Sequence, residues 1–285
     1  RHVAANAVFD SGILRVERFG PKGGRPLIFV PALFCGSWEW NAQINALSSE
    51  YDIFVVTLPG FDGRPMVSGD ALMERAARDL HLLIATKDLK RPIVIGHSLG
   101  GTLTVFFAER YPNDTAGIVT VEGGYPVAAT QSLRDAQVAR TVKPYERITQ
   151  SELGPALREN MLQYTITSTA DVNTVERLAA RSDPDAIVAW LRAALTLDLT
   201  PALSSIRVPF TAIVPFDNEI DPYRGFKSRD SKRAAYVRWA SRARYGKVII
   251  IDNSRHFVMF DQPKLFAQVL QSALARTRDT SSASL

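Results

Sequence analysis

The chain has 285 residues, of which 46% are hydrophobic and 22% charged, and its formal net charge is +5. This composition is that of an ordinary globular protein and excludes a disordered or collagen-like chain. No apolar run approaches the roughly 20 residues that a membrane-spanning helix needs, so no membrane span is expected. The 34 basic residues are offset by 29 acidic ones along the chain, and without a recognition motif this small excess does not predict nucleic-acid binding.

Cysteine and histidine usage limits the kinds of site that the chain can form. Cys35 is the single cysteine, which excludes an internal disulfide and a multi-cysteine zinc site. The histidines, at positions 2, 81, 97 and 256, form no pair with the spacing of metal ligands. We therefore expect neither a metal nor another cofactor.

Short runs of β-branched and aromatic residues alternate with helical patterns along the chain. Strands are expected over residues 13–19, 26–33, 51–58, 92–96, 117–121, 210–215 and 247–251, and helices near 70–86, 99–110, 223–244 and 262–275. Several of the strand runs are apolar without alternation, which is typical of strands covered on both faces. The alternation predicts an α/β fold with a mostly parallel, doubly wound sheet.

Residues 125–205 interrupt this alternation, because they contain helical patterns and no convincing strand. One helix start is clear, with Asp183 as the cap and Pro184 at the first helical position. We expect a helical lid over 125–205, inserted between two parts of one core at 1–124 and 206–285.

The most basic stretch of the chain lies at residues 229–247. Its apolar residues follow helical spacing, so the stretch is interpreted as the solvated face of a helix and not as a nucleic-acid or membrane site. Its basic side chains are Arg229, Lys232, Arg233, Arg238, Arg242, Arg244 and Lys247.

The strongest motif is the sequence GHSLGG at residues 96–101, between an apolar strand run and a helical stretch. A Gly-x-Ser-x-Gly in this setting is typical of a nucleophile elbow, a sharp turn that presents a strained serine. The following helix N-terminus stabilises negative charge nearby. Ser98 is therefore the expected nucleophile.

A serine nucleophile needs a general base, and His256 has the right position. It follows the strand expected at 247–251, and active sites of such folds gather at the carboxyl ends of sheet strands. His2 lies at the start of the chain, His81 lies within a helical pattern, and His97 belongs to the elbow itself. The order of serine before histidine also suits a hydrolase of this architecture.

With these motifs the sequence resembles the α/β-hydrolase superfamily over essentially its whole length. In that family the residue after a His-Gly pair lends its N–H to the oxyanion hole, and Pro31-Ala32 stand at the place of that pair here. The resemblance implies an oxyanion hole made of the N–H groups of Leu33 and Leu99. It also places the acid of the triad after the strand that follows the lid, where Asp217 and Asp221 are found. Some relatives take the acid from the preceding strand end, where Glu122 stands.

Among these acids Asp217 is preferred, because a carboxylate directly after a strand is held by a stiff, short loop. Asp221 precedes Pro222 and could be a turn residue, and Glu122 could contact the lid hinge. Both remain alternatives at this point.

The resemblance implies a serine hydrolase that cleaves a carboxylic ester or related acyl compound through an acyl-enzyme. A C–C bond hydrolase or a lactonase with the same triad is the alternative, and a ligand receptor that retains the triad without turnover is the rival from another class. The substrate is expected to be a small, apolar ester, because aromatic residues occur in the loops and lid around the serine: Phe34, Trp38, Phe61, Trp190 and Phe257. Resemblance to exported bacterial hydrolases, with the absence of an initial methionine, favours a periplasmic or secreted location.

Overall fold

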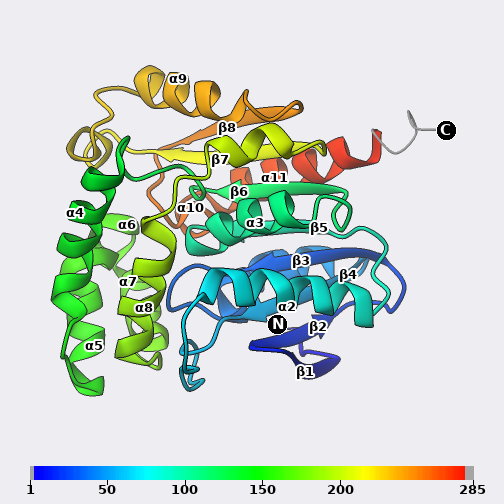
Figure 1. The fold of residues 1–285 in the computed structure, drawn as a ribbon, viewed down its shortest axis with the longest axis horizontal. Coiled ribbons are helices and arrows are strands. Elements are labelled where there is room, and N and C mark those ends of the chain that lie inside the picture. The colour runs from blue at the N-terminus through cyan, green and yellow to red at the C-terminus, as the bar shows by residue number, and fades with distance from the viewer. Residues whose placement is uncertain (1–2, 280–285) are drawn as a thin grey trace.

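A computed structural model of the chain describes residues 3–279. Its core is an eight-stranded sheet with the order β1-β2-β4-β3-β5-β6-β7-β8, which runs from β1 at the bottom to β8 near the top of Figure 1. The strands are β1 (Ala7–Ser11), β2 (Leu14–Phe19), β3 (Arg25–Val30), β4 (Tyr51–Thr57), β5 (Ile93–His97), β6 (Gly117–Val121), β7 (Phe210–Phe216) and β8 (Gly246–Asp252). β1 and β2 are antiparallel to their neighbours, and all pairs from β4 to β8 are parallel.

The mostly parallel sheet predicted from the sequence is confirmed, and the reason lies in the central strands. β4, β5, β6 and β7 are buried along their whole length, as their unbroken apolar runs predict. β1 is an additional strand that is not expected from the sequence, since this edge strand is short and mostly exposed. The strand order reverses around β3, which has β4 on one side and β5 on the other. Ligand sites of open parallel sheets form at the carboxyl ends of strands beside such a reversal.

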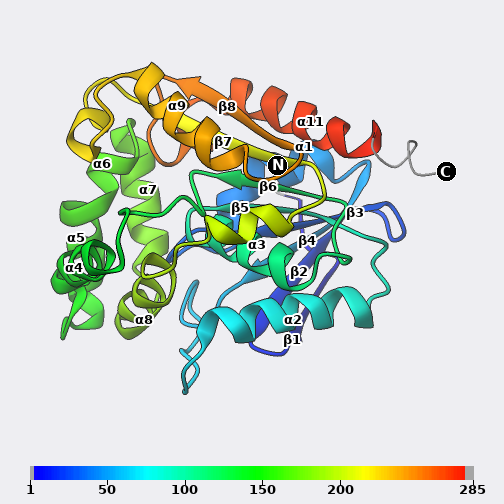
Figure 2. The same cartoon turned by 45° about the horizontal axis from the view of Figure 1, so that its top comes forward.

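Helices cover both faces of the sheet, as Figure 2 shows. One face carries α2 (Leu72–Thr86), α3 (Leu99–Arg110) and α9 (Arg229–Ala240), and the other carries α1 (Asn41–Leu47) and α11 (Pro263–Asp279). α9 is shorter than the helix expected at 223–244, because Gly225 adopts a left-handed φ of 91° and Ser228 then starts the helix with a capping box. The doubly wound arrangement is that of the sequence prediction.

The chain between β6 and β7 contains helices and no strand among the described residues. Its α-helices are α4 (Gln131–Val142), α5 (Gln150–Leu157), α6 (Gln163–Thr165), α7 (Thr169–Ala179) and α8 (Pro184–Leu195). They stand as a layer at the left of Figure 1, beside one end of the sheet. α8 starts as expected, since the Asp183 side chain accepts the backbone N–H of Asp185 at 2.9 Å. The indole N–H of Trp190, on α8, donates to the Pro59 carbonyl at 3.0 Å and ties this layer to the core.

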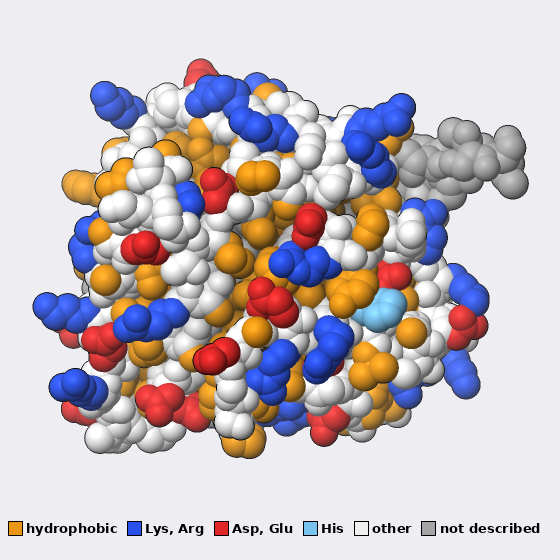
Figure 3. Space-filling model, in the orientation of Figure 1, with side chains coloured by type: hydrophobic (Ala, Val, Ile, Leu, Met, Phe, Trp, Pro, Cys, Tyr) orange, Lys and Arg blue, Asp and Glu red, His pale blue; other side chains and the backbone are white. Residues whose placement is uncertain are grey.

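The surface carries no extended single-sign patch on the face seen in Figure 3, where acidic and basic side chains are interspersed. The stretch at 229–247 is interpreted from the sequence as a solvated helix face, and its basic side chains are exposed except for that of Lys232. Lys232 is fully buried, at 0% exposure. No helix within residues 3–279 is long and apolar enough to cross a membrane.

Candidate active site

Ser98 lies in a sharp turn between β5, which ends at His97, and α3, which begins at Leu99. Its backbone has φ 53° and ψ −116°, a strained conformation for a residue with a side chain. The turn needs glycine on both sides. A Cβ on Gly96 would lie 2.1 Å from the Gly100 carbonyl oxygen, and one on Gly100 would lie 2.1 Å from the Val30 carbonyl oxygen. The sequence motif thus produces the elbow geometry that holds Ser98 at the carboxyl edge of the sheet.

His256 lies in the loop after β8, and its imidazole pairs with a carboxylate from the end of β6. The distance between His256 Nδ1 and Glu122 Oε2 is 2.5 Å. Glu122 follows the last residue of β6 directly and adopts a positive φ of 39°. A non-glycine residue in this region of φ is uncommon and costs energy, and such strain gathers at functional sites. The other ring nitrogen of His256, Nε2, has no hydrogen-bond partner among the described residues. The His256 side chain lines the same cavity as Ser98.

Burial and neighbouring charge shift the pKa values of both members of this pair below their ordinary values. Burial alone would raise the pKa of the Glu122 carboxyl. The ammonium of Lys232 outweighs this effect, together with His256 and Arg224, and holds that pKa well below its ordinary value. Burial lowers the pKa of His256 to about 4, against the opposing pull of the Glu122 carboxylate. At neutral pH the site therefore contains an ionised acid and a neutral imidazole.

These shifts predict how activity depends on pH. A general base must be neutral, and a lowered pKa keeps His256 neutral further into the acid range than the ordinary value of 6.5 allows. We expect the acid limb of kcat/KM to have its midpoint close to 4, with little change from about pH 5.5 to 8. The measurement is the pH profile of ester hydrolysis, with the fold checked by circular dichroism at each pH. A midpoint at or above 6.5 would contradict this account of His256.

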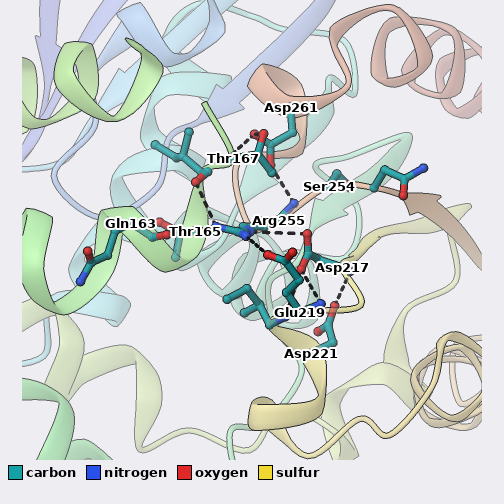
Figure 4. A network of polar contacts seen from close by, with 12 residues as sticks. Gln163, Thr165, Thr167, Asp217, Glu219, Asp221, Ser254, Arg255 and Asp261 are labelled. Carbon is teal, nitrogen blue, oxygen red and sulfur yellow. Dashed lines mark hydrogen bonds and ion pairs between the residues drawn. The ribbon is translucent and has the colours of Figure 1, made fainter. Parts of the chain in front are cut away.

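The acid preferred from the sequence, Asp217, is not beside His256, and Figure 4 shows where its carboxylate points. Its Oδ1 accepts the backbone N–H groups of Glu219 and Ile220 at 2.9 and 3.0 Å, and its Oδ2 lies 3.5 Å from Nε of Arg255. Asp217 thus closes the turn after β7. The geometry corrects the sequence ranking and favours Glu122, because both residues directly follow a strand but only the Glu122 carboxylate reaches His256.

Asp221, the other alternative, does not contact His256 either. Its Oδ1 lies 2.6 Å from Nζ of Lys232, and its Oδ2 accepts the backbone N–H of Asp217 at 2.8 Å. The same Lys232 ammonium donates to Glu122 Oε1 at 2.8 Å. Lys232 therefore bridges the carboxylates that follow β6 and β7. The sequence interpretation misses this role because the lysine stands among exposed basic residues, and only its helical spacing with Tyr236 places it on the inner face of α9.

A second buried chain of polar groups connects the elbow, the base and the loop after β3. Nε2 of His97 donates to the backbone carbonyl of His256 at 2.9 Å, and its Nδ1 lies 2.7 Å from Glu39 Oε1. The other carboxylate oxygen of Glu39 accepts the N–H of Ala32 at 3.0 Å. Both His97 and Glu39 have side chains with no exposed surface. These hydrogen bonds hold the loop after β3, which contains the predicted oxyanion residue, against the loop of His256. His97 therefore has a structural role in the elbow, as expected from the sequence.

Leu33 and Leu99, the residues expected to form the oxyanion hole, both line the cavity at Ser98. Within the described part of the chain neither backbone N–H has a hydrogen-bond acceptor. Ala32 takes the place of the family's glycine without a positive φ, and the left-handed residue of this loop is Phe34, with φ 56°. Leu33 and Leu99 thus retain two N–H groups that can donate to a substrate oxygen.

A cavity of about 550 Å³ lies between the carboxyl ends of the strands and the helices of 125–205. Three of the aromatic residues proposed from the sequence, Phe34, Trp190 and Phe257, line this cavity. Phe61 is instead buried behind the wall, with its ring 6.4 Å from that of Trp190, and Trp38 packs against the core. Both corrections have the same cause, because a loop's place in the chain does not determine which way its aromatic side chains turn.

The loop that carries His256 is also bound to the helical layer, as the centre of Figure 4 shows. A guanidinium N–H of Arg255 donates to the Gln163 carbonyl at 3.1 Å, and the backbone N–H of Phe257 donates to the Thr165 carbonyl at 3.0 Å. These contacts lie on both sides of His256. The position of His256 therefore depends on the helices of 125–205 as well as on β8.

Of the two remaining histidines, His81 lies away from this site. His81 lies on α2 and pairs with Asp114, at 2.5 Å between Nδ1 and Oδ2. His2 lies outside the described residues. Within residues 3–279 no group of three or more His, Cys, Asp or Glu side chains is placed to hold a metal ion. The single cysteine, Cys35, is a buried free thiol.

The sheet topology and the strained serine turn define the class of protein as an α/β hydrolase. The sequence model of the alpha/beta hydrolase family matches residues 27–269, and the chain belongs to this family. It is accordingly a hydrolytic enzyme, as the sequence resemblance implies.

The chain is similar to several bacterial enzymes. The chain is 23% identical over 266 residues to an (E)-2-((N-methylformamido)methylene)succinate hydrolase of Acinetobacter baylyi, covering 89% of this chain and 92% of that protein. It is 26% identical over 192 residues to a 2-succinyl-6-hydroxy-2,4-cyclohexadiene-1-carboxylate synthase of Pectobacterium atrosepticum, covering 65% and 74% of the two chains. Among solved structures, a thermophilic esterase from Thermogutta terrifontis superposes with a TM-score of 0.75 at 20% identity, over 97% of this chain and 98% of that one. This last similarity shows the shared fold.

Proposed function

We propose that the protein is a serine hydrolase that cleaves a small carboxylic ester or related acyl compound through an acyl-enzyme on Ser98. The observation that carries this proposal is the convergence of three features on one cavity wall. They are the strained Ser98, the imidazole of His256 held by Glu122 at 2.5 Å, and the two unpaired N–H groups of Leu33 and Leu99.

The proposed reaction has two balanced steps. In the first, Ser98 Oγ attacks the substrate carbonyl carbon while Nε2 of His256 takes the hydroxyl proton. The N–H groups of Leu33 and Leu99 stabilise the oxyanion, each contributing roughly 3–4 kcal/mol in such sites. The imidazolium then gives its proton to the departing alcohol, which leaves the acyl group on Ser98. In the second step His256 takes a proton from a water molecule whose oxygen attacks the acyl carbon. The imidazolium then returns that proton to Ser98 Oγ as the acyl–oxygen bond breaks, which releases the acid product.

Glu122 acts in both steps through His256. Its carboxylate accepts the Nδ1 proton, which leaves Nε2 available as base, and it stabilises the imidazolium that forms in each transition state. The lowered pKa of Glu122 supports this role, since only the ionised carboxylate does both.

The cavity supports a small substrate with an apolar part, because most of its wall is aliphatic or aromatic. We propose that the helices of 125–205 act as a lid that sets substrate size, since α8 contributes a row of cavity side chains: Trp190, Leu191, Ala194 and Leu195. The similarity to a named succinate hydrolase over 89% of the chain supports hydrolysis of an acyl compound.

The lid proposal predicts a change in chain-length preference when the cavity is filled. Ala194 lines the cavity from α8, so Ala194→Phe should exclude long acyl chains while leaving room for acetate near Ser98. We expect kcat/KM for a p-nitrophenyl octanoate to fall at least tenfold more than that for the acetate. Ala193→Phe, on the neighbouring residue that does not line the cavity, is the matched control. Equal losses on both esters in Ala194→Phe would contradict the lid.

A panel of p-nitrophenyl esters of increasing chain length tests the proposed activity as a whole. We expect turnover that is abolished by Ser98→Ala. Product analysis with carbon–carbon or lactone substrates distinguishes the alternatives that use the same triad. Tight ligand binding with no product from any substrate would instead favour a receptor.

A further inference from the structure

The structure assigns to Lys232 a positioning role in the proposed hydrolase: from α9 it holds the Glu122 carboxylate in the orientation that His256 requires. This inference rests on the proposed function, since it concerns the acid of that triad. It rests on three geometric observations, namely the burial of Lys232, its two carboxylate partners and the way in which it divides the oxygens of Glu122.

The first observation is that Lys232 has no contact with water. Lysine is almost never fully buried unless its charge is paired, because removing an ammonium from water is costly. Here Nζ lies 2.6 Å from Asp221 Oδ1 and 2.8 Å from Glu122 Oε1. The fold thus places a costly buried cation directly behind the proposed catalytic acid.

The second observation is how the oxygens of Glu122 are used. Oε1 accepts from Lys232 and Oε2 faces Nδ1 of His256, so each oxygen has one hydrogen-bond partner, and Arg224 lies farther from Oε2, at 3.6 Å. A glutamate side chain has three rotatable torsions, and a single contact with the imidazole would leave the carboxylate free to turn. The ammonium of Lys232 removes this freedom and determines which oxygen the imidazole meets.

The third observation is that Lys232 is itself held from behind. Asp221 uses Oδ1 for the ammonium and Oδ2 for the backbone N–H of Asp217, so both of its oxygens are engaged. A chain of charged groups, from Asp221 through Lys232 and Glu122 to His256, therefore connects the segment after β7 with the catalytic base. Asp221, in the segment after β7, therefore acts on His256 through Lys232 and Glu122 and not by direct contact.

The electrostatic surroundings of Glu122 show what the loss of Lys232 would do. Burial disfavours the ionised carboxylate, and Lys232 is the strongest of the groups that oppose burial. Arg224 is more distant, with 3.6 Å between its NH1 and Glu122 Oε2. The ionisable groups that face Glu122 are Lys232 and Tyr236 from α9, Arg224 and Asp221 from the segment after β7, and His256 from the loop after β8.

The alternative is that Lys232 only neutralises Asp221 and so contributes to stability. Two variants separate these roles. Lys232→Met removes the ammonium but keeps a side chain of similar length, and it leaves two buried carboxylates without their cation. The double variant Lys232→Met, Asp221→Asn also removes the charge of Asp221, and replacing both members of a buried ion pair by neutral groups is often tolerated.

The experiment measures thermal unfolding and the pH profile of kcat/KM for p-nitrophenyl acetate in the wild type and both variants. Loss of a nearby cation raises the pKa of the Glu122 carboxyl, and Glu122 and His256 titrate as a coupled pair that is active only as carboxylate and neutral imidazole. We therefore expect the acid limb to move to higher pH in Lys232→Met and to stay displaced in the double variant, although the latter regains stability. The activity of both at neutral pH should be at least tenfold below that of the wild type.

Asp52→Asn is the matched control for lost stability. Asp52 is buried near the amino end of β4, whereas the cavity lies at the carboxyl ends of the strands. It forms a bidentate ion pair with Arg18, with two hydrogen bonds of 2.7 Å. It should lower the unfolding temperature without moving the acid limb. NMR titration of the His256 imidazole adds a readout that does not depend on turnover, and its midpoint should move in Lys232→Met but not in Asp52→Asn.

The possible results are distinct. A double variant with the rate and acid limb of the wild type would overturn the positioning role and leave Lys232 as a structural ion-pair partner. A wild type whose ester hydrolysis is absent, or survives Ser98→Ala, would instead overturn the proposed function itself, and the role of Lys232 with it.

Discussion

Ser98→Ala should lower kcat for p-nitrophenyl acetate by a factor on the order of 10⁴ to 10⁶, because no acyl-enzyme can form without the hydroxyl. The oxyanion N–H groups and the cavity remain, so a small residual rate above that of water is expected. Substrate binding should be nearly unchanged, since the hydroxyl contributes little to the cavity wall.

The same variant should fold normally, which makes the loss specific to chemistry. The strained backbone at Ser98 is imposed by its neighbours, above all by the tight packing of Gly96 and Gly100. An unchanged circular dichroism spectrum and unfolding temperature provide the control. Retention of more than a hundredth of the wild-type kcat would contradict Ser98 as nucleophile.

Glu122→Gln should lower kcat by about 10⁴, with the fold preserved. A glutamine amide cannot stabilise the imidazolium by charge. The glutamine can also turn its NH₂ group towards Nδ1 of His256. This orientation favours the imidazole tautomer that has its proton on Nε2, and in this tautomer Nε2 cannot act as the base. The measurement is kcat on the same ester at pH 7 to 8, above the ordinary pKa of histidine.

Asp217→Asn is the matched control for this prediction, because it removes a carboxylate of the same site without touching His256. Its asparagine oxygen can still accept the N–H groups of Glu219 and Ile220, so the turn after β7 should persist. We expect a loss of less than tenfold. The reverse pattern, with Asp217→Asn inactive and Glu122→Gln active, would show that the triad takes its acid from the segment after β7.

The fold could be predicted from the sequence because its signals are local. The central strands are unbroken apolar runs, and the helix start at Asp183 and Pro184 is a capping pattern that the structure contains. The candidate nucleophile is equally predictable, since GHSLGG holds both the serine and the glycines that its turn requires. His256 followed from its place after the last strand.

The acid and its partner could not be predicted with the same security, because their roles depend on side-chain directions set by packing. Asp217 and Glu122 both follow a strand, but the turn at Asp217 uses its carboxylate for backbone N–H groups. Lys232 stands in a basic stretch whose other members are exposed, and its burial depends on how α9 lies against β7 and β8. The sequence indicates the burial of Lys232 only through its helical spacing with the apolar residues of α9, such as Tyr236.

The central claim is that Ser98 carries the acyl group, and labelling with an organophosphonate tests it most directly. Such a reagent forms a stable covalent bond only with an activated serine, and peptide mass spectrometry identifies the modified residue. We predict one adduct per chain, located on Ser98, with complete loss of esterase activity and no adduct in Ser98→Ala. An active enzyme that is inhibited while Ser98 remains unmodified, or that carries the adduct on another residue, would contradict the account.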